Sequence, residues 1–421
     1  MTDRNRESGS RRLLAGLLAA SHLMPLELLP ASLAEYAAPA GITEARIYLS
    51  DVQRRVLRRL TGAGAVGTAD GPPEELEIEG TVPGRAYQYG QVLPAAPADR
   101  GRHQWWMPLL DGTERIGLLR LTAATDDTRT HEDMELLSAL VALIVVSKRD
   151  FSDAYARLVG SESMNIAAEM QWRLMPPTTY ADGRVALSAV MEPAFEISGD
   201  AYDYATDGPR VHLSIFDAMG HDTAAGLTAN LALGACRNAR HHGADLVRTG
   251  ERVDEVLIEQ FQGARYATAI LADLDTRRGE LSWVNCGHHP PLIIRGGRWT
   301  TQLRCPPALP LGMGLGLEAT LCREQLQPGD RVVLYTDGIT EARRPGGREF
   351  GLTLFTDFLI RHHADGLPVP ETLRRLVRAV MAHHDGHLQD DATVLFCEWL
   401  GPQPGPTDQA ATLMGLPSAG P

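Results

Sequence analysis

Acidic residues at the ends of apolar stretches constrain the fold of this 421-residue chain more than any other feature. Asp217 and Asp337 each end a run typical of a buried strand, Asp390 and Asp391 directly precede another, and Asp200 lies in a Ser-Gly-Asp turn. A carboxylate beside a buried strand is costly to desolvate unless a cation meets it. No arginine or lysine is adjacent in sequence to any of these acids, and all-oxygen ligand sets favour Mg²⁺ or Mn²⁺. The pattern therefore predicts a divalent-cation site.

Each acid also has an ordinary interpretation. An aspartate before glycine is usually a turn residue satisfied by its own backbone, and Asp337 taken alone fits that role. Acidic motifs repeated in order along one strand-rich region favour the metal site.

Composition excludes several classes of protein. The net charge of −13 argues against nucleic acid or an anionic membrane surface as the main partner. Lys148 is the only lysine, which excludes a P-loop ATPase, a protein kinase and a Schiff-base enzyme. We expect no membrane span, because the apolar run at 136–146 is too short.

The cysteines and the N-terminus bear on location. Five scattered cysteines with no Cys-x-x-Cys pair predict reduced thiols and a cytoplasmic protein; they are Cys236, Cys286, Cys305, Cys322 and Cys397. Residues 11–20 mimic a signal peptide, but the spacing of the leucines that follow favours an amphipathic first helix.

The chain divides into five predicted segments. Residues 1–12 are polar and expected to be loose, and residues 13–150 alternate helix and strands, as in an α/β domain. Residues 151–177 form a helical connector that ends at two prolines. Residues 178–400 form a second domain, and residues 401–421 are proline-rich and predicted to be a disordered tail.

The second domain is predicted to alternate strands and helices. The predicted strands are 184–191, 211–217, 267–273, 280–285, 292–295, 331–336 and 392–399. The predicted helices are 224–242, 252–262, 352–363 and 369–384. Strands packed between helix pairs favour an α/β/β/α sandwich.

Four features of residues 13–150 resemble a GAF domain. They are an initial helix, the run Ile-Glu-Gly-Thr-Val-Pro-Gly-Arg-Ala at 78–86, a hairpin at 105–121 around an Asp-Gly turn, and a closing helix at 131–148. The resemblance implies a small-ligand sensor, although no cofactor motif is visible.

A series of short motifs runs through residues 165–399. They read Gln-Trp-Arg-Leu-Met-Pro-Pro (171–177), Ile-Ser-Gly-Asp-Ala-Tyr-Asp (197–203), Asp-Ala-Met-Gly-His (217–221), Tyr-Ala-Thr-Ala (266–269), Asn-Cys-Gly-His-His-Pro-Pro-Leu (285–292), Pro-Leu-Gly (310–312), Tyr-Thr-Asp-Gly-Ile-Thr-Glu-Ala (335–342) and Asp-Asp-Ala-Thr (390–393). In this order they resemble the metal-dependent serine/threonine phosphatases of the protein phosphatase 2C superfamily. Within it they resemble the bacterial stage II sporulation protein E and sigma-regulator branch. Asp222 is one departure, because the family has glycine there.

The resemblance implies hydrolysis of phosphoserine or phosphothreonine by a water activated between two Mn²⁺ or Mg²⁺ ions. It implies that Asp217 bridges the ions, helped by the carbonyl of Ala218, and that Asp200 supports one ion largely through water. It implies that Asp337 and Asp390 hold the other ion. Asp391 replaces or assists Asp390, and the sequence leaves that choice open.

Two histidines are candidates for proton transfer. His288 lies in a Gly-His-His-Pro-Pro turn, where we expect it to stabilise the loop. For His221, a hydrogen bond to a metal ligand is favoured over a general-acid role.

The same resemblance implies a partner and a form of regulation. The substrate would be a phosphorylated anti-sigma-factor antagonist, and the N-terminal domain would set activity through the connector, whose stripe includes Met170 and Leu174. A homodimer through this helix is compatible with the pattern. The alternatives are a non-catalytic scaffold, which loss of a metal acid would favour, and a nucleotide cyclase or phosphodiesterase, which the Thr-Asp-Gly-Ile-Thr-Glu motif opposes.

Overall fold

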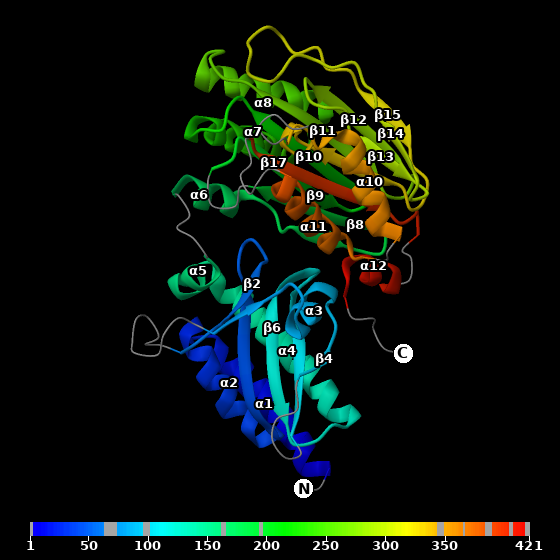
Figure 1. Ribbon diagram of the computed structural model, residues 1–421. Helices are drawn as coiled ribbons and strands as arrows, with labels where there is room; N and C mark the ends of the chain where they lie inside the picture. The colour runs from blue at the N-terminus through cyan, green and yellow to red at the C-terminus, as the bar shows by residue number, and fades with distance from the viewer. Residues whose placement is uncertain are drawn as a thin grey trace. The chain divides into compact units, whose positions relative to one another are not determined.

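The computed structural model describes residues 3–62, 74–95, 102–160, 166–192, 197–342, 349–364, 367–383, 390–403 and 407–416. The chain forms two compact units, whose main spans are Met1–Ser163 and Met164–Met414 (Figure 1). This boundary lies inside the predicted connector.

The first unit is built on one antiparallel sheet in the order β3-β2-β1-β6-β5-β4. The elements are α1 (Asp3–Ser21), α2 (Leu29–Ala37), β1 (Ile42–Ser50), β2 (Val56–Arg59), β3 (Glu75–Glu77), α3 (Val82–Tyr89), β4 (Leu93–Pro94), β5 (His103–Asp111), β6 (Glu114–Ala123), α4 (Thr128–Arg149) and α5 (Asp153–Val159). Leucines of α1, α2 and α4 share a buried cluster with Ile47 and Leu119 of the sheet. Tyr48 and Trp106, which alternate to the other face, pack with α3.

The predicted hairpin around Asp111 and Gly112 is confirmed, and Gly112 adopts the positive φ of 58° that such a turn requires. The expectation of a loose N-terminus was wrong, because α1 begins at Asp3. The buried Leu13 and Leu17 anchor this helix, and Ser10 donates a 2.5 Å hydrogen bond to Asp133 of α4. The likeness to a GAF domain stays a prediction.

The second unit contains two antiparallel sheets, in the orders β15-β12-β11-β10-β9 and β14-β13-β16-β17-β8-β7. Its strands are β7 (Thr179–Ala181), β8 (Val185–Glu192), β9 (Asp200–Asp207), β10 (Arg210–Ala218), β11 (Ala267–Asp275), β12 (Glu280–Cys286), β13 (Leu292–Arg295), β14 (Trp299–Gln302), β15 (Cys322–Gln325), β16 (Arg331–Tyr335) and β17 (Ala392–Trp399). Its helices are α6 (Ile166–Leu174), α7 (Thr223–His241), α8 (Leu246–Phe261), α9 (Asp337–Thr340), α10 (Gly351–Ala364), α11 (Val369–His383) and α12 (Thr407–Met414).

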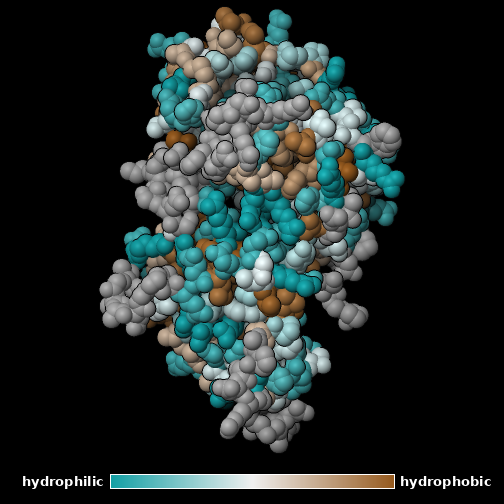
Figure 2. Space-filling view, viewed as in Figure 1, coloured by the Kyte–Doolittle hydropathy of each residue, from teal (hydrophilic) through white to brown (hydrophobic). Residues whose placement is uncertain are grey.

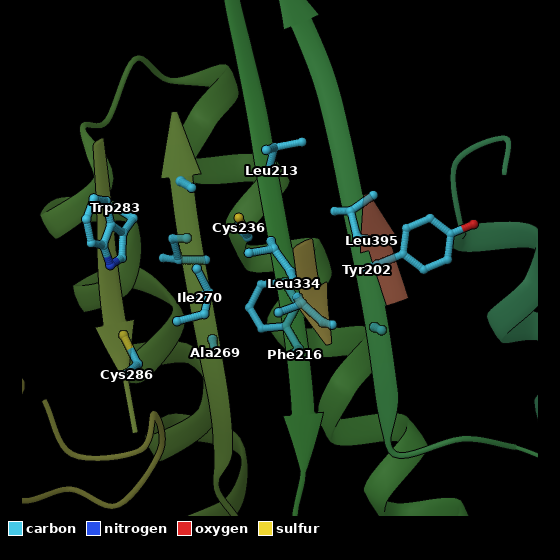
Figure 3. Packing of buried hydrophobic residues seen from close by; sticks show 14 of the residues in the cluster. Tyr202, Leu213, Phe216, Cys236, Ala269, Ile270, Trp283, Cys286, Leu334 and Leu395 are labelled. Carbon is cyan, nitrogen blue, oxygen red and sulfur yellow. The ribbon is translucent and has the colours of Figure 1, made fainter. Parts of the chain in front are cut away.

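The two sheets share a hydrophobic core, and helices cover their outer faces. Figure 3 shows members of the largest cluster from β9 to β12, together with Leu334 of β16 and Leu395 of β17. Ala229 and Leu257 of α7 and α8 belong to this cluster, whereas α10 and α11 pack on the second sheet in a separate one. The predicted α/β/β/α sandwich is therefore confirmed.

The connector is not one helix, as predicted for residues 151–177, but two. α5 packs on the first unit, where the Val52 amide donates to the Val159 carbonyl at 3.2 Å. α6 packs on the second unit through the buried Ala168 and Gln171. Gly160 ends α5 in an extended conformation, which interrupts the helical pattern.

The prediction of a disordered tail at 401–421 was wrong for part of its length. Residues 407–414 form α12, which packs against β7, β8 and α11. Ala410, Leu413 and Met414 have the i, i+3, i+4 spacing of one helix face and lie against apolar residues.

The prediction of uniformly reduced thiols was also wrong. Cys305 and Cys322 form a disulfide, with their Cα atoms 5.9 Å apart, while Cys236, Cys286 and Cys397 are free and buried. The two bonded cysteines are 17 residues apart in sequence, and only the folded loop brings them together.

Within the described residues, no helix combines the length and apolarity needed to cross a bilayer. The face of the molecule seen in Figure 2 is largely hydrophilic, with apolar residues in separate patches.

A buried ion-pair cluster joins β9 to α7 and provides a test of this packing. Asp203 is 1% exposed and contacts Arg237 at 2.6 Å and Arg240 at 2.9 Å. Because Asp203→Ala leaves two partly buried guanidinium groups without their partner, we expect it to lower the free energy of unfolding by about 3 kcal/mol.

Thermal denaturation measures this change. Asp207→Ala, at the exposed end of the same strand, is the matched control and should change stability by less than about 0.5 kcal/mol. An equal loss in the two variants would contradict the assigned role of the cluster.

Candidate active site

Both sheets of the second unit contribute acids to one region. Asp200 begins β9 and lies directly opposite Asp217 of β10 in the antiparallel ladder. Asp337 begins α9, just after β16, and Asp390 and Asp391 directly precede β17. The Thr336 hydroxyl links the two sheets by donating to Asp200 Oδ2 at 2.7 Å.

The acids differ in burial and in the donors they meet. Asp200 and Asp391 are buried, and Asp390 is exposed. Asp391 accepts a hydrogen bond from the Gly199 backbone amide, which fixes one of its oxygens. Asp390 accepts from the Asp391 amide at 2.9 Å and has its outer side open to solvent. Asp390 is thus better placed to take an ion, and Asp391 to hold the Gly199 loop.

Burial and mutual repulsion raise the pKa of most of these carboxyl groups. Burial, followed by the neighbouring Asp337, Asp390 and Asp391, raises the pKa of Asp217 to about 7. Burial also raises the pKa of Asp391 to about 6, and it raises the pKa of Asp200 well above its ordinary value with help from Asp217. This region therefore opposes full ionisation unless positive charge is added.

The donor set is suited to a hard cation. Among the described residues, none of the five carboxylates is paired with an arginine or lysine. Carboxylate oxygens are the ligands that Mg²⁺ and Mn²⁺ prefer, and an added cation would relieve the repulsion. No three His, Cys, Asp or Glu side chains of the described residues already converge closely enough to hold an ion.

Two glycines let backbone segments approach closely here. A Cβ at Gly199 would lie 2.5 Å from the Gly220 carbonyl oxygen and 3.0 Å from that of Ala218. A Cβ at Gly338 would lie 2.0 Å from the Asp391 carbonyl oxygen. Any side chain at these positions would push the acidic segments apart.

Gln171 of α6 holds the segment that carries Asp200. Its side-chain amide donates to the carbonyls of Ser198 (2.8 Å) and Asp200 (2.7 Å), and its Oε1 accepts from the Ser198 amide at 2.9 Å. The side chain is only 1% exposed. The second helix of the predicted connector is therefore bonded directly to the acidic region.

His288 has the structural environment expected for it. Its Nε2 lies 3.0 Å from the Tyr335 carbonyl and its Nδ1 lies 2.6 Å from the Thr268 hydroxyl. Burial lowers the pKa of His288 to about 4, so the ring is neutral. His221 is exposed. Burial raises the pKa of both Asp390 and Asp391, and a positive charge on the nearby His221 would oppose that rise.

Sequence reasoning missed His289. Its Nε2 is 3.9 Å from Asp337 Oδ2, and its ring stacks on Tyr335 at a centroid distance of 6.1 Å. Proximity to Asp337 raises the pKa of His289 and lowers that of Asp337. The only signal in the sequence was its position beside His288 in a turn that was already singled out.

Residues 207–400 match the family described as stage II sporulation protein E (SpoIIE). This part of the chain is therefore similar to the SpoIIE family. The match includes Asp217, Asp337, Asp390 and Asp391, while Asp200 lies just before it.

The chain is also similar to curated proteins and to solved structures. The chain is 22% identical over 232 residues to phosphoserine phosphatase RsbU of Bacillus subtilis, with 55% of this chain and 68% of that protein covered. It is 24% identical over 213 residues to phosphoserine phosphatase RsbP of the same species, with 49% of this chain and half of that protein covered. The SiaA-PP2C domain of Pseudomonas aeruginosa is 22% identical with a TM-score of 0.48, and the alignment covers 55% of this chain and 94% of that domain.

The raised pKa of Asp217 predicts a pH-dependent stability for the metal-free second unit. A folded-state pKa near 7 against an unfolded value of 3.8 means that the folded state binds the extra proton between these values. Stability is therefore lost as pH rises through about 7. Asp217→Asn removes this titration. We therefore expect the free energy of unfolding of the variant to exceed that of wild type by about 2 kcal/mol at pH 8 and by much less at pH 4.

Melting temperatures of chelator-treated protein across pH 4–8 test this. A difference between variant and wild type that does not change with pH would show that Asp217 does not titrate as the geometry indicates.

Proposed function

We propose that the protein is a metal-dependent phosphatase that hydrolyses phosphoserine or phosphothreonine on a protein. The observation that carries the proposal is the group of five carboxylates from adjacent strand ends, with no arginine or lysine partner among the described residues. Their raised pKa values favour a cation as the missing partner.

Each residue has a proposed task. When bound, two Mn²⁺ or Mg²⁺ ions would lower the pKa of a water and offset charge on the phosphoryl oxygens. Asp217 and the carbonyl of Ala218 would hold both ions, Asp200 would support one of them, and Asp337 and Asp390 would hold the other. Asp391 would keep the Gly199 loop in place through its bond to the backbone amide.

The substrate is proposed to be a phosphorylated regulator of the anti-sigma-factor antagonist type. The relatives named phosphoserine phosphatase support phosphoserine as the group that is hydrolysed. A cytoplasmic location stays a prediction, and the Cys305–Cys322 disulfide is an observation against it.

Regulation by the N-terminal domain is proposed to act through α6. Gln171 on one face of this helix bonds to the Ser198–Asp200 segment, so a shift of α6 would move an acidic residue. Met170 and Leu174, an i, i+4 pair on the same helix, are 60% and 40% exposed, which leaves them available to a second segment or a second copy.

One observation favours the alternative of a catalytically weak scaffold. Within the described residues the acidic groups do not already form a metal-binding cluster. The same observation fits an enzyme whose carboxylates come together only when the metal ions bind. A titration with Mn²⁺ distinguishes the enzyme from the scaffold.

Metal dependence is the first test. We expect chelator-treated full-length protein to hydrolyse p-nitrophenyl phosphate only after Mn²⁺ or Mg²⁺ is added, because the acids alone neither activate a water nor offset charge on the phosphoryl oxygens. Asp217→Asn should reduce the rate at least a hundredfold, since the proposed bridge is lost. Persistent activity after exhaustive chelation, or wild-type turnover in this variant, would exclude the proposed mechanism.

The role of α6 gives a second test. Met170→Gln/Leu174→Gln should fold normally, because both side chains are exposed, yet it should change the Mn²⁺-saturated rate at least threefold if this face couples the domains. The matched control is Arg173→Gln on the same helix, whose 3.2 Å pair with Glu169 is exposed. Equal rates in all three proteins would indicate that the exposed face of α6 is a passive spacer.

A further inference from the structure

Arg265 lies beside the segment that follows Asp217. It comes just before β11, whose Ala267 pairs with Ala218 at the end of β10. The register therefore brings Arg265 next to residues 219–222, and its Nη1 is 3.4 Å from the Met219 carbonyl oxygen. Arg265 is thus a cationic side chain held against the loop that carries the central acidic residue.

Asp222 fixes the orientation of this guanidinium group. Nη1 lies 3.3 Å from Asp222 Oδ1, and Nη2 lies 3.1 Å from Asp222 Oδ2, a two-point contact. Asp222 is itself fixed, because its Oδ1 accepts from the Ala225 amide at 2.7 Å as the N-cap of α7. The orientation is set by backbone and carboxylate together.

The contact with Asp222 uses one edge of the guanidinium and leaves another edge open. The bonds to Asp222 and Met219 employ Nη1 and one hydrogen of Nη2. Within the described residues, the Nε hydrogen and the second Nη2 hydrogen have no acceptor. The Arg265 side chain is 24% exposed, so solvent or a ligand can reach it. Two parallel N–H donors of this kind match two oxygens of a phosphate.

The pair adds little to stability by itself. Asp222 is 61% exposed, and exposed ion pairs contribute little because water and salt screen them. A fixed arginine that is only weakly stabilising, at the border of an otherwise acidic region, is better explained by ligand recognition than by folding.

We propose that Arg265 is a specificity-determining residue that binds the phosphoryl group of the substrate through its Nε and Nη2 hydrogens. Asp222 is the positioning residue that orients it. This inference rests on the proposed phosphatase function, and it deepens that function by assigning a protein cation to the phosphate. It also gives a reason for the acidic residue at position 222, where the family resemblance leads one to expect glycine.

The test uses full-length protein at saturating Mn²⁺ with p-nitrophenyl phosphate as substrate. Arg265→Ala should lower kcat/KM about tenfold, mainly by raising KM, because two charge-assisted hydrogen bonds are lost. Arg265→Lys keeps the positive charge but lacks the paired N–H donors, so its kcat/KM should lie between those of wild type and Arg265→Ala. Asp222→Asn should lower kcat/KM about threefold. Arg248→Ala is the matched control. This variant removes the exposed pair between Arg248 and Glu251 near the start of α8, and its kcat/KM should stay within twofold of wild type.

Two binding measurements make the result independent of turnover. Calorimetric titration of inorganic phosphate into the Mn²⁺-loaded protein should give about tenfold weaker binding for Arg265→Ala. Mn²⁺ affinity should stay within twofold of wild type. Unchanged phosphate binding in Arg265→Ala, or a parallel loss of Mn²⁺ affinity, would overturn the assignment, the latter because Arg265 would then only position the loop. If the proposed phosphatase function is wrong, wild-type protein itself will not hydrolyse p-nitrophenyl phosphate. That outcome differs from a loss confined to the Arg265 variants.

Discussion

Repulsion among carboxylates at neighbouring strand ends is the constraint on which the second unit depends. Asp200 and Asp217 lie opposite each other in one ladder, and three more acids approach from the other sheet. Like charges placed directly across a ladder are destabilising. The fold tolerates them because the Thr336 hydroxyl and the Gly199 amide donate to two of the acids, and because several carboxyl groups can remain protonated. Such an arrangement is costly unless a ligand benefits from it.

The rest of the second unit keeps these acids together. The shared core fixes the distance between the sheets, so the ends of β10 and β16 cannot drift apart without opening it. Gly199 and Gly338 then bring backbone segments within a spacing that no side chain would permit. The acidic segments are therefore packed closely against one another along the backbone.

Much of this domain could be predicted because its strands carry long apolar runs. β10, β16 and β17 were found from such runs, and the acids at their ends followed. β9 was missed as a strand, since Asp200 and Asp203 interrupt its apolar pattern and are tolerated only through Thr336 on the other sheet and two arginines of α7. The Cys305–Cys322 bond and the seating of α12 likewise depend on contacts between distant segments. No local pattern records such contacts, and the same holds for His289 and Arg265, whose neighbours are set by strand register and loop packing.

The hydrogen bonds between Gln171 and the acidic region have a consequence for how this protein could change over evolutionary time. Its three hydrogen bonds go to backbone atoms of Ser198 and Asp200, and none goes to a side chain. Substitutions in the segment it holds would therefore leave these bonds in place, as long as the backbone path is kept. Hydrogen bonds of this kind can persist while the surrounding residues diverge. α6 could therefore be joined to different upstream domains without a change in the residues that contact the acidic segment.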